Sequence, residues 1–510
     1  MNRRSVALAT ASGLFLVFIF PTLNVHLLAW IALVPLFLAL SGQSVKNGFW
    51  LGGITGIVYF AGTVHWVMNS MHYYGGIPLI PASLITSLLC AYLAFYPALF
   101  GAVVVHLRRN HPSLLILSAP AVWTALEFAR TYAFSGFPWS LLGYSQYLAL
   151  PLIQVSDIAG VYGVSFLIVF VNAAVAEFLT DRQKYPLLLI AAVTMVLVLG
   201  YGLMRLSVPV NIGGVTVSVV QGNIEQDKKW DPTFQRETLD VYERLTQEAL
   251  QQHPDIVIWP ETATPFYFNG EGLRDSALRE DLRSFVKKNG VPLLFGSPTY
   301  EVRPDGAVHL RNSAFLLTSD GTVGAAYHKI HLVPFGEYVP LKNVLFFIEK
   351  MVHSSGDFEA GNDYTVFTLA PHRQGTAREV KLNTAICYEI IFPDLIRRFV
   401  DRGAAIITTI TNDAWFGRTA APYQHFSMAV FRAVENRVPV ARAANTGVSG
   451  FIDAKGRILD TSAIFTKAYL SHTLTPGSVK TFYTRYGDVF SCLCLLGSIF
   501  LLVNPPQRFP

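Results

Sequence analysis

The segment KLNTAICYE, residues 381–389, decides the fold class of the polar part of this chain. Its first six residues predict a β-strand, and that strand ends directly at Cys387. Open α/β sheets present their reactive groups at the C-terminal ends of strands. Cys387 is also the one cysteine of the polar part, because Cys90, Cys492 and Cys494 lie in apolar stretches. Its position therefore suits a nucleophile, whereas a lone free cysteine is more commonly buried and inert; from the segment alone the two interpretations stand about level.

Strand and helix patterns alternate on both sides of this segment, over residues 209–485. Short β-branched runs predict strands, and amphipathic runs between them predict helices. This alternation indicates one layered α/β domain, and the turn Ser319-Asp320-Gly321 indicates that part of the sheet is antiparallel. The predicted strands are 215–221, 255–259, 292–296, 313–318, 381–386 and 404–410, and the predicted helices are 233–252, 278–288 and 424–437.

Charge divides the chain into two parts of different character. Residues 1–208 hold 9 Lys and Arg and 4 Asp and Glu, whereas the remaining residues hold 30 of each kind. Only 14% of the whole chain is charged, against about 25% in soluble proteins, which excludes a purely soluble protein. The net charge of +5 stems from the apolar part, which argues against a nucleic-acid-binding face. Four cysteines in 510 residues also exclude a disulfide-stapled secreted module.

Eight apolar segments predict helices that span a membrane, for which about 20 apolar residues are needed. Seven of them precede the polar part and one follows it. The sequence therefore predicts a membrane domain at 1–208, a polar domain at 209–485, and a last span with a C-terminal tail at 486–510. The eight segments are 5–20, 27–41, 48–68, 82–105, 113–130, 162–180, 186–204 and 486–503.

Positive charges predict the orientation of these spans, because Lys and Arg gather on the cytoplasmic side. With the N-terminus inside, the loops near 21–26, 69–81 and 131–161 face outward and carry no Lys or Arg. The cytoplasmic segments carry Arg3, Arg4, Lys46, Arg108, Arg109, Arg182, Lys184 and Arg508. Both termini are therefore expected in the cytoplasm of a bacterium, and the polar domain in the periplasm, on the outer side of the inner membrane.

Two charged residues could complete a site around Cys387. Glu261 follows the strand predicted at 255–259, and Lys329 begins the run KIHLVPFGE. Taken singly, Glu261 fits a carboxylate that caps a turn, and Lys329 fits a solvated strand lysine. Together with the thiol they supply a nucleophile, a base that removes its proton, and a cation that stabilises an oxyanion.

In this order and spacing, Glu261, Lys329 and Cys387 resemble the Glu-Lys-Cys triad of the nitrilase superfamily, over about residues 214–475. With seven apolar segments before this region and one after it, the whole chain resembles the membrane-embedded apolipoprotein N-acyltransferases of bacteria. The other matching motifs are Gly136-Phe137-Pro138-Trp139, Gln221-Gly222-Asn223 with Trp230, and Asn412-Asp413-Ala414-Trp415-Phe416-Gly417.

The resemblance implies a four-layer α-β-β-α sandwich for the polar domain. It also implies that an acyl chain passes from a phospholipid, with phosphatidylethanolamine the expected donor, through a thioester on Cys387. The acceptor is then the α-amine of the N-terminal diacylglyceryl-cysteine of apolipoproteins. Supporting or substrate-binding roles are expected for Glu337, Tyr388, Glu389, Trp230, Trp415, Trp139 and Asn412. The sequence predicts a monomer with no cofactor and no nucleic-acid partner. It also predicts no metal site, because its His residues show no paired ligand motif.

Two other functions remain open at this point. A membrane-anchored amidase of the nitrilase type, which hydrolyses small amides, would use the same three residues but would need only one anchor. A transporter with an external regulatory domain would need charged residues or broken helices along a substrate path. The first four apolar segments contain no Asp, Glu, Lys or Arg.

The apolar run Val344–Ile348 is unusual inside a charged domain. It is too short to span a membrane, and Lys342 and Lys350 flank it as in interfacial segments. We therefore expect residues 340–356 to form a lid that dips into the outer leaflet. The alternative is that the run packs in the domain core.

Overall fold

The computed structural model describes residues 1–209, 213–229, 231–338, 358–370 and 379–504. Trp230 and the lid expected at 340–356 lie outside these described residues. The chain divides into two compact units. The first comprises Met1–Asn69, Pro78–Val208 and Tyr486–Pro510, and the second comprises Ser70–Ile77 and Pro209–Arg485.

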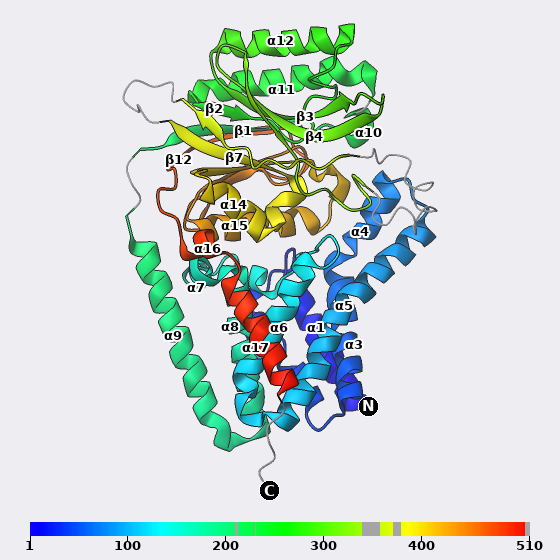
Figure 1. Ribbon diagram of the computed structural model, residues 1–510, viewed down its shortest axis with the longest axis vertical. Helices are drawn as coiled ribbons and strands as arrows, with labels where there is room; N and C mark the ends of the chain where they lie inside the picture. The colour runs from blue at the N-terminus through cyan, green and yellow to red at the C-terminus, as the bar shows by residue number, and fades with distance from the viewer. Residues whose placement is uncertain (210–212, 230, 339–357, 371–378, 505–510) are drawn as a thin grey trace. The chain divides into compact units, whose positions relative to one another are not determined.

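The first unit is a bundle of helices (Figure 1). Among the described residues, four helical segments are long and apolar enough to cross a membrane. A fifth results if α3 (Val45–Val64) and the bent segment Trp66–Tyr74 form one span. The four are α5 (Leu79–Asn110), α6 with its preceding turn (Pro112–Tyr132), α8 (Ser156–Thr180), and α9 with its preceding turn (Arg182–Ser207).

The other three apolar segments also form helices, but these are shorter. The helix α1 (Arg3–Phe18) has 16 residues, which at about 1.5 Å per residue falls short of a hydrocarbon core about 30 Å thick. The segment His26–Leu40, which contains α2 (Val34–Leu40), and α17 (Val489–Val503) are shorter still. By length and composition, the described residues thus support four or five spans rather than the eight predicted.

Trp139, expected as a supporting residue, belongs to the first unit. Its buried ring lies on Trp66, with 4.8 Å between the ring centroids. Its main-chain oxygen accepts a hydrogen bond of 3.0 Å from the guanidinium of Arg130 in α6. Glu127, one helical turn before Arg130, accepts a hydrogen bond of 2.7 Å from the main-chain nitrogen of Leu142. Both charged side chains therefore hold the segment around Trp139 against α6.

The second unit contains two six-stranded sheets, in the orders β12-β1-β2-β3-β4-β5 and β11-β10-β9-β8-β7-β6. Neighbouring strands β1, β2 and β3 are parallel, as are β7, β8 and β9, and antiparallel strands flank both groups. This confirms an α/β domain with mixed sheets, including antiparallel β4 and β5 around the turn at 319–321. The strands are β1 (Val215–Gln221), β2 (Ile256–Ile258), β3 (Leu293–Val302), β4 (Val308–Leu317), β5 (Val323–His328), β6 (Phe367–Leu369), β7 (Val380–Ile386), β8 (Ile406–Thr411), β9 (Val440–Ala444), β10 (Gly450–Ile452), β11 (Ile458–Thr461) and β12 (Ala468–Leu474).

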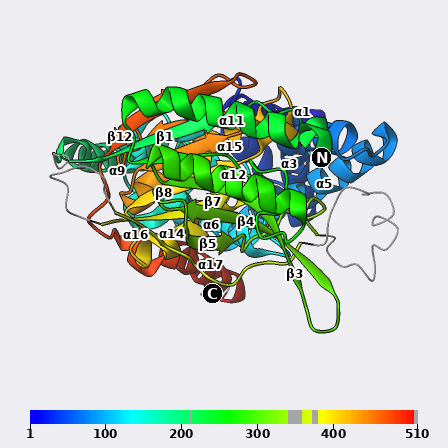
Figure 2. The same ribbon diagram turned by 90° about the horizontal axis from the view of Figure 1, so that it is seen from above.

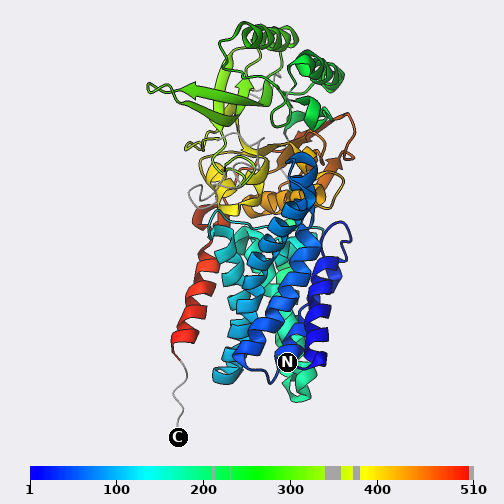
Figure 3. The same ribbon diagram turned by 90° about the vertical axis from the view of Figure 1, so that its right-hand side faces the viewer.

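Helices lie on the outer faces of the two sheets (Figures 1 and 3). The helices α11 (Gln235–Ala249) and α12 (Leu273–Asn289) run side by side over the first sheet (Figure 2). Apolar residues of α11, among them Leu245, pack into a buried cluster with residues of β2 and β3, among them Phe295. The helices α14 (Pro393–Asp401) and α15 (Ala421–Asn436) lie against the second sheet. Each sheet thus buries one face against helices.

Candidate active site

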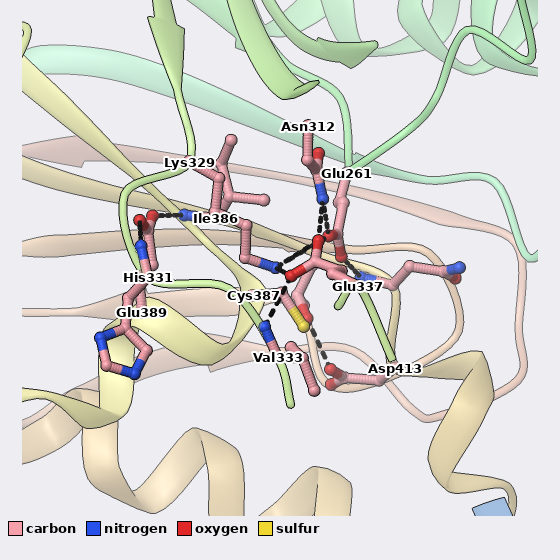
Figure 4. A network of polar contacts seen from close by, with 12 residues as sticks. Glu261, Asn312, Lys329, His331, Val333, Glu337, Ile386, Cys387, Glu389 and Asp413 are labelled. Carbon is pink, nitrogen blue, oxygen red and sulfur yellow. Dashed lines mark hydrogen bonds and ion pairs between the residues drawn. The ribbon is translucent and has the colours of Figure 1, made fainter. Parts of the chain in front are cut away.

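Four strand ends converge on one polar cluster (Figure 4). Lys329 directly follows β5, Cys387 directly follows β7, and Asn412 directly follows β8. Glu261 lies three residues after β2. The three residues expected to carry catalysis are therefore brought to one place, although distant segments of the chain supply them.

Buried donors hold the Glu261 carboxylate at both oxygens. Its Oε1 lies 2.8 Å from Nδ2 of Asn312, and its Oε2 lies 2.8 Å from the main-chain nitrogen of Asn412. The backbone is confined as well, because a Cβ at Gly296 would lie 2.7 Å from the Glu261 Cα. Only glycine leaves room there. Glu261 is therefore a fixed carboxylate with little freedom to turn away.

The ammonium of Lys329 lies between two carboxylates. Its Nζ is 3.0 Å from Oε1 and 2.9 Å from Oε2 of Glu337, and 3.6 Å from Oε1 of Glu261. Burial lowers the pKa of Lys329, but the two negative charges outweigh burial and raise this pKa above its usual value. Asn312 and the main-chain nitrogen of Val333 also donate to Glu337, each at 2.8 Å. Lys329 is thus a positively charged residue that forms ion pairs with both Glu337 and Glu261.

Cys387 begins the short helix η8 (Cys387–Ile391) with a φ of +53°. A non-glycine residue rarely adopts this left-handed conformation, and such residues cluster at functional sites. Burial raises the pKa of the Cys387 thiol and the charge of Glu261 raises it further, while Lys329 acts in the opposite direction. The resting group is therefore a thiol, and a base must take its proton before it can attack a carbonyl.

A network of buried charged and polar side chains contacts the main chain of Cys387. Nε2 of His425 lies 3.1 Å from the main-chain oxygen of Cys387, and Nδ1 lies 3.2 Å from Oδ1 of Asp413. The guanidinium of Arg442 donates to Oδ2 of Asp413 at 2.8 Å. Burial acts to raise the pKa of Asp413, but Arg442 and His425 outweigh it and keep this pKa below its usual value. Asp413 is therefore an ionised anchor for the imidazole.

Glu389, for which a supporting role was expected, contacts the main chain beside the cluster, as Figure 4 shows. Its carboxylate points to the main chain of β7 and of the segment after β5. Burial raises the pKa of Glu389 to about 7, although the nearby donors act to lower it. Its donors are the hydroxyl of Tyr327 (2.7 Å) and the main-chain nitrogens of Ile330 (2.7 Å), His331 (3.0 Å) and Ile386 (2.7 Å). Glu389 therefore ties the segment that carries Lys329 to the strand that carries Cys387.

The remaining expected residues of this unit that the structure describes are Tyr388, Asn412 and Trp415. The buried ring of Tyr388 packs on Phe392, with 5.1 Å between centroids. Besides its contact to Glu261, Asn412 donates from Nδ2 to Gln226 at 2.7 Å. Trp415 lies edge to face with Tyr74, at 6.2 Å, in the segment Ser70–Ile77 of the same unit. Asn412 thus contacts a carboxylate of the cluster directly, whereas the ring contacts of Tyr388 and Trp415 are with other aromatic residues.

Each of the two units contains a region that matches a known protein family. Residues 12–174 match the family described as the apolipoprotein N-acyltransferase N-terminal domain, and residues 216–483 match the carbon-nitrogen hydrolase family. An apolipoprotein N-acyltransferase from Geobacter metallireducens is 41% identical over 97% of this chain and 94% of its own length. The chain belongs to the apolipoprotein N-acyltransferase family. The family member from Methylococcus capsulatus is 34% identical, over 95% of this chain and 93% of its own.

Among solved structures, a mutant amidase of the nitrilase superfamily from Nesterenkonia AN1 aligns with 52% of this chain and 93% of its own. It shares 21% sequence identity with this chain, at a TM-score of 0.38.

Three residues of the cluster in this family member were not predicted from the sequence. Asn312 bridges the carboxylates of Glu261 and Glu337 from β4. His425 supports Cys387 from α15, where the helix pattern alone gives no reason to single it out. Lys229 donates to the main-chain oxygen of Glu261 at 3.0 Å. Asn312 could have been singled out as a polar residue within an apolar strand, because buried polar groups need partners. Lys229 could have been singled out because it lies near the Gln221-Gly222-Asn223 motif in the sequence.

Proposed function

We propose that this chain transfers an acyl chain from a phospholipid, with phosphatidylethanolamine as the expected donor, to apolipoproteins. The acceptor is the α-amine of the N-terminal diacylglyceryl-cysteine. The observation that carries this proposal is the similarity to apolipoprotein N-acyltransferases along 97% of the chain. A thiol, a fixed carboxylate and a permanent cation in one cluster support it chemically.

The first half-reaction loads the acyl chain onto Cys387. Glu261 takes the thiol proton, and the thiolate adds to the ester carbonyl of the phospholipid. A positive donor stabilises the resulting oxyanion, which is worth about 3 kcal/mol in barrier per donor. The tetrahedral intermediate then expels the lysophospholipid alkoxide, which takes the proton back from Glu261. A thioester on Cys387 remains.

The second half-reaction moves the acyl chain to the lipoprotein. The α-amine adds to the thioester carbonyl and loses a proton to Glu261. The Cys387 thiolate then leaves and recovers that proton, so an amide and the starting enzyme result. Water would hydrolyse the thioester, and a site at a lipid surface limits its access.

We further propose that residues 1–208 form the membrane domain, that 209–485 form the periplasmic catalytic domain, and that 486–510 add the last span. Eight spans in the bacterial inner membrane then leave both termini in the cytoplasm. The uneven distribution of Lys and Arg supports this orientation, and the apolar helices support insertion. A monomer carries all the residues that the mechanism uses.

The decisive experiment incubates the detergent-solubilised protein with phosphatidylethanolamine and a diacylglyceryl lipopeptide. We expect an acyl adduct on Cys387, release of lysophospholipid, and loss of the adduct when the lipopeptide is added. Mass spectrometry of protein and peptide measures each step. Release of free fatty acid or hydrolysis of a small amide, with no acylated lipopeptide, would instead support the amidase hypothesis.

A further inference from the structure

Asn445 is a buried asparagine that directly follows β9 of the second sheet. The main-chain nitrogen of Ile224 donates to its Oδ1 at 2.9 Å, and its Nδ2 donates to the main-chain oxygen of Ile224 at 2.8 Å. Its own main-chain oxygen accepts a hydrogen bond of 2.9 Å from the main-chain nitrogen of Asn223. Asn445 therefore fixes the segment that follows β1, a strand of the first sheet.

Three side-chain amides, those of Asn445, Asn412 and Gln226, form a chain of hydrogen bonds. A main-chain nitrogen only donates and a main-chain oxygen only accepts, so the two contacts to Ile224 fix which end of the Asn445 amide is Nδ2. This Nδ2 also donates to Oδ1 of Asn412 at 3.0 Å, and Nδ2 of Asn412 donates to Oε1 of Gln226 at 2.7 Å. The side chain of Asn412 is therefore held at both of its polar atoms.

Two routes lead from Asn445 to Glu261. In the first, Asn445 holds Asn412, whose main-chain nitrogen donates to Oε2 of Glu261 at 2.8 Å. In the second, Asn445 holds Ile224, which begins the segment that contains the short helix α10 (Gln226–Lys229). The last residue of α10 donates from its Nζ to the main-chain oxygen of Glu261 at 3.0 Å. One side chain thus fixes two segments that contact the carboxylate and the main chain of Glu261.

The position of Glu261 matters because the base and the thiol come from different sheets. Glu261 follows β2 of the first sheet, whereas Cys387 follows β7 of the second. A general base must lie within hydrogen-bond reach of the proton that it accepts, and a displacement of about 1 Å costs up to about 100-fold in rate. A shift of one sheet against the other would change this distance, and the bonds of Asn445 to the segment after β1 oppose such a shift.

We propose that Asn445 is a positioning residue for the proton transfer from Cys387 to Glu261. In this step the S–H bond breaks, an O–H bond forms on the carboxylate, and a thiolate remains. Asn445 acts through Asn412 and through residues 224–229, which hold the carboxylate where it can accept this proton. The assignment rests on the role of Glu261 as the base in the proposed function.

The test measures the burst of acyl uptake from p-nitrophenyl octanoate. The burst amplitude counts the competent active sites, whereas the burst rate constant reports the step that Glu261 assists. In Asn445→Ala we expect an amplitude close to that of the wild type and a rate constant that is lower by about 10-fold or more. In the Glu261→Gln background the same substitution should cause no further fall, because an amide cannot accept the proton wherever it is held.

Asn436→Ala is the matched control. Asn436 is also a buried asparagine, but its side chain donates to the main-chain oxygen of Arg432 and accepts from the hydroxyl of Thr484. Its replacement should lower the free energy of unfolding and leave the burst rate constant unchanged. A structural effect of removing a buried amide is thereby separated from an effect on Glu261.

Gln226→Met is the second variant, for use if Asn445→Ala does not fold. Gln226 is half-buried at the other end of the amide chain, and its replacement removes the acceptor of the Asn412 side chain. We expect a lower burst rate constant in this variant too, and again no further fall in the Glu261→Gln background.

The outcomes separate this inference from the proposed function. If Asn445→Ala slowed the Glu261→Gln enzyme by the same factor as the wild type, the assignment would be overturned and Glu261 would remain the base. An unchanged rate constant in Asn445→Ala and Gln226→Met would overturn it as well. Uptake at the wild-type rate in Glu261→Gln itself would contradict both the base and this assignment. Uptake from the nitrophenyl ester but not from phosphatidylethanolamine would contradict the phospholipid donor alone, and the dependence of the Asn445 effect on Glu261 would still support the positioning role.

Discussion

The Nε2 atom of the buried His425 imidazole lies 3.1 Å from the main-chain oxygen of Cys387. The other ring nitrogen, Nδ1, contacts the ionised carboxylate of Asp413, which also accepts a hydrogen bond from the guanidinium of Arg442. This contact holds the main chain of Cys387, which has a φ of +53°. The orientation of the thiol therefore depends on a residue 38 positions further along the chain.

His425→Ala should loosen this conformation. Removing one partner of a buried hydrogen bond costs about 1–3 kcal/mol, so the free energy of unfolding should fall by that amount. Alkylation of Cys387 should slow, because its thiol no longer has one fixed position. Denaturant unfolding and iodoacetamide kinetics measure the two effects. Alkylation at the wild-type rate would show that the contact does not orient the thiol.

Cys387→Ala should abolish both acyl uptake and transfer to the lipopeptide, since no other group can form the thioester. Cys492→Ala is the matched control, because Cys492 is an exposed cysteine of α17, and its activity should equal that of the wild type. Lysophospholipid release and peptide mass are the measurements. Continued lysophospholipid release by Cys387→Ala would contradict a covalent mechanism.

Glu261→Gln should slow acyl uptake by roughly 100-fold or more, the usual contribution of a general base. The amide is of similar size but cannot accept the thiol proton, and its NH₂ would face the donors of Asn312 or Asn412. Exposed Glu271→Gln serves as control. Burst kinetics with a nitrophenyl ester measure the step. Uptake at the wild-type rate would mean that another group deprotonates Cys387.

The charge asymmetry predicts the topology. Single cysteines introduced at residues 183 and 250 should differ in their reaction with a membrane-impermeant maleimide added to intact spheroplasts. We expect residue 250 to react from outside and residue 183 to react only after the membrane is opened. Equal labelling of both positions would contradict the span predicted at 186–204 and with it the count of seven spans before the polar domain.

Local patterns were enough to predict the α/β class and the division into an apolar and a polar part. The period of apolar residues depends on which face of a strand or helix is buried, and each segment carries that period itself. Glu261 and Cys387 each follow a predicted strand, whereas no predicted strand ends at Lys329. The resemblance to the Glu-Lys-Cys triad joined the three residues in one predicted site. The structure brings these side chains together, and their chemical roles remain predictions.

Other features depend on where distant segments meet. Asn412 donates to Glu261 across 151 positions of the chain, and Glu389 collects donors from about 60 positions away. A hydrogen bond needs two groups within about 3 Å, and no local pattern encodes which distant group arrives there. The same holds for Lys229 and His425, whose partners lie on other elements.

The number of continuous apolar helices was also decided by the tertiary structure. Apolar composition predicts that a segment prefers a membrane, but the length of each helix depends on where its backbone breaks. The helix α1 ends at Phe18, before Pro21. The segment Val45–Val64 bends by 45° against Trp66–Tyr74. Sequence therefore determined which segments are apolar enough to prefer a membrane, while packing and backbone geometry decided the length of each helix.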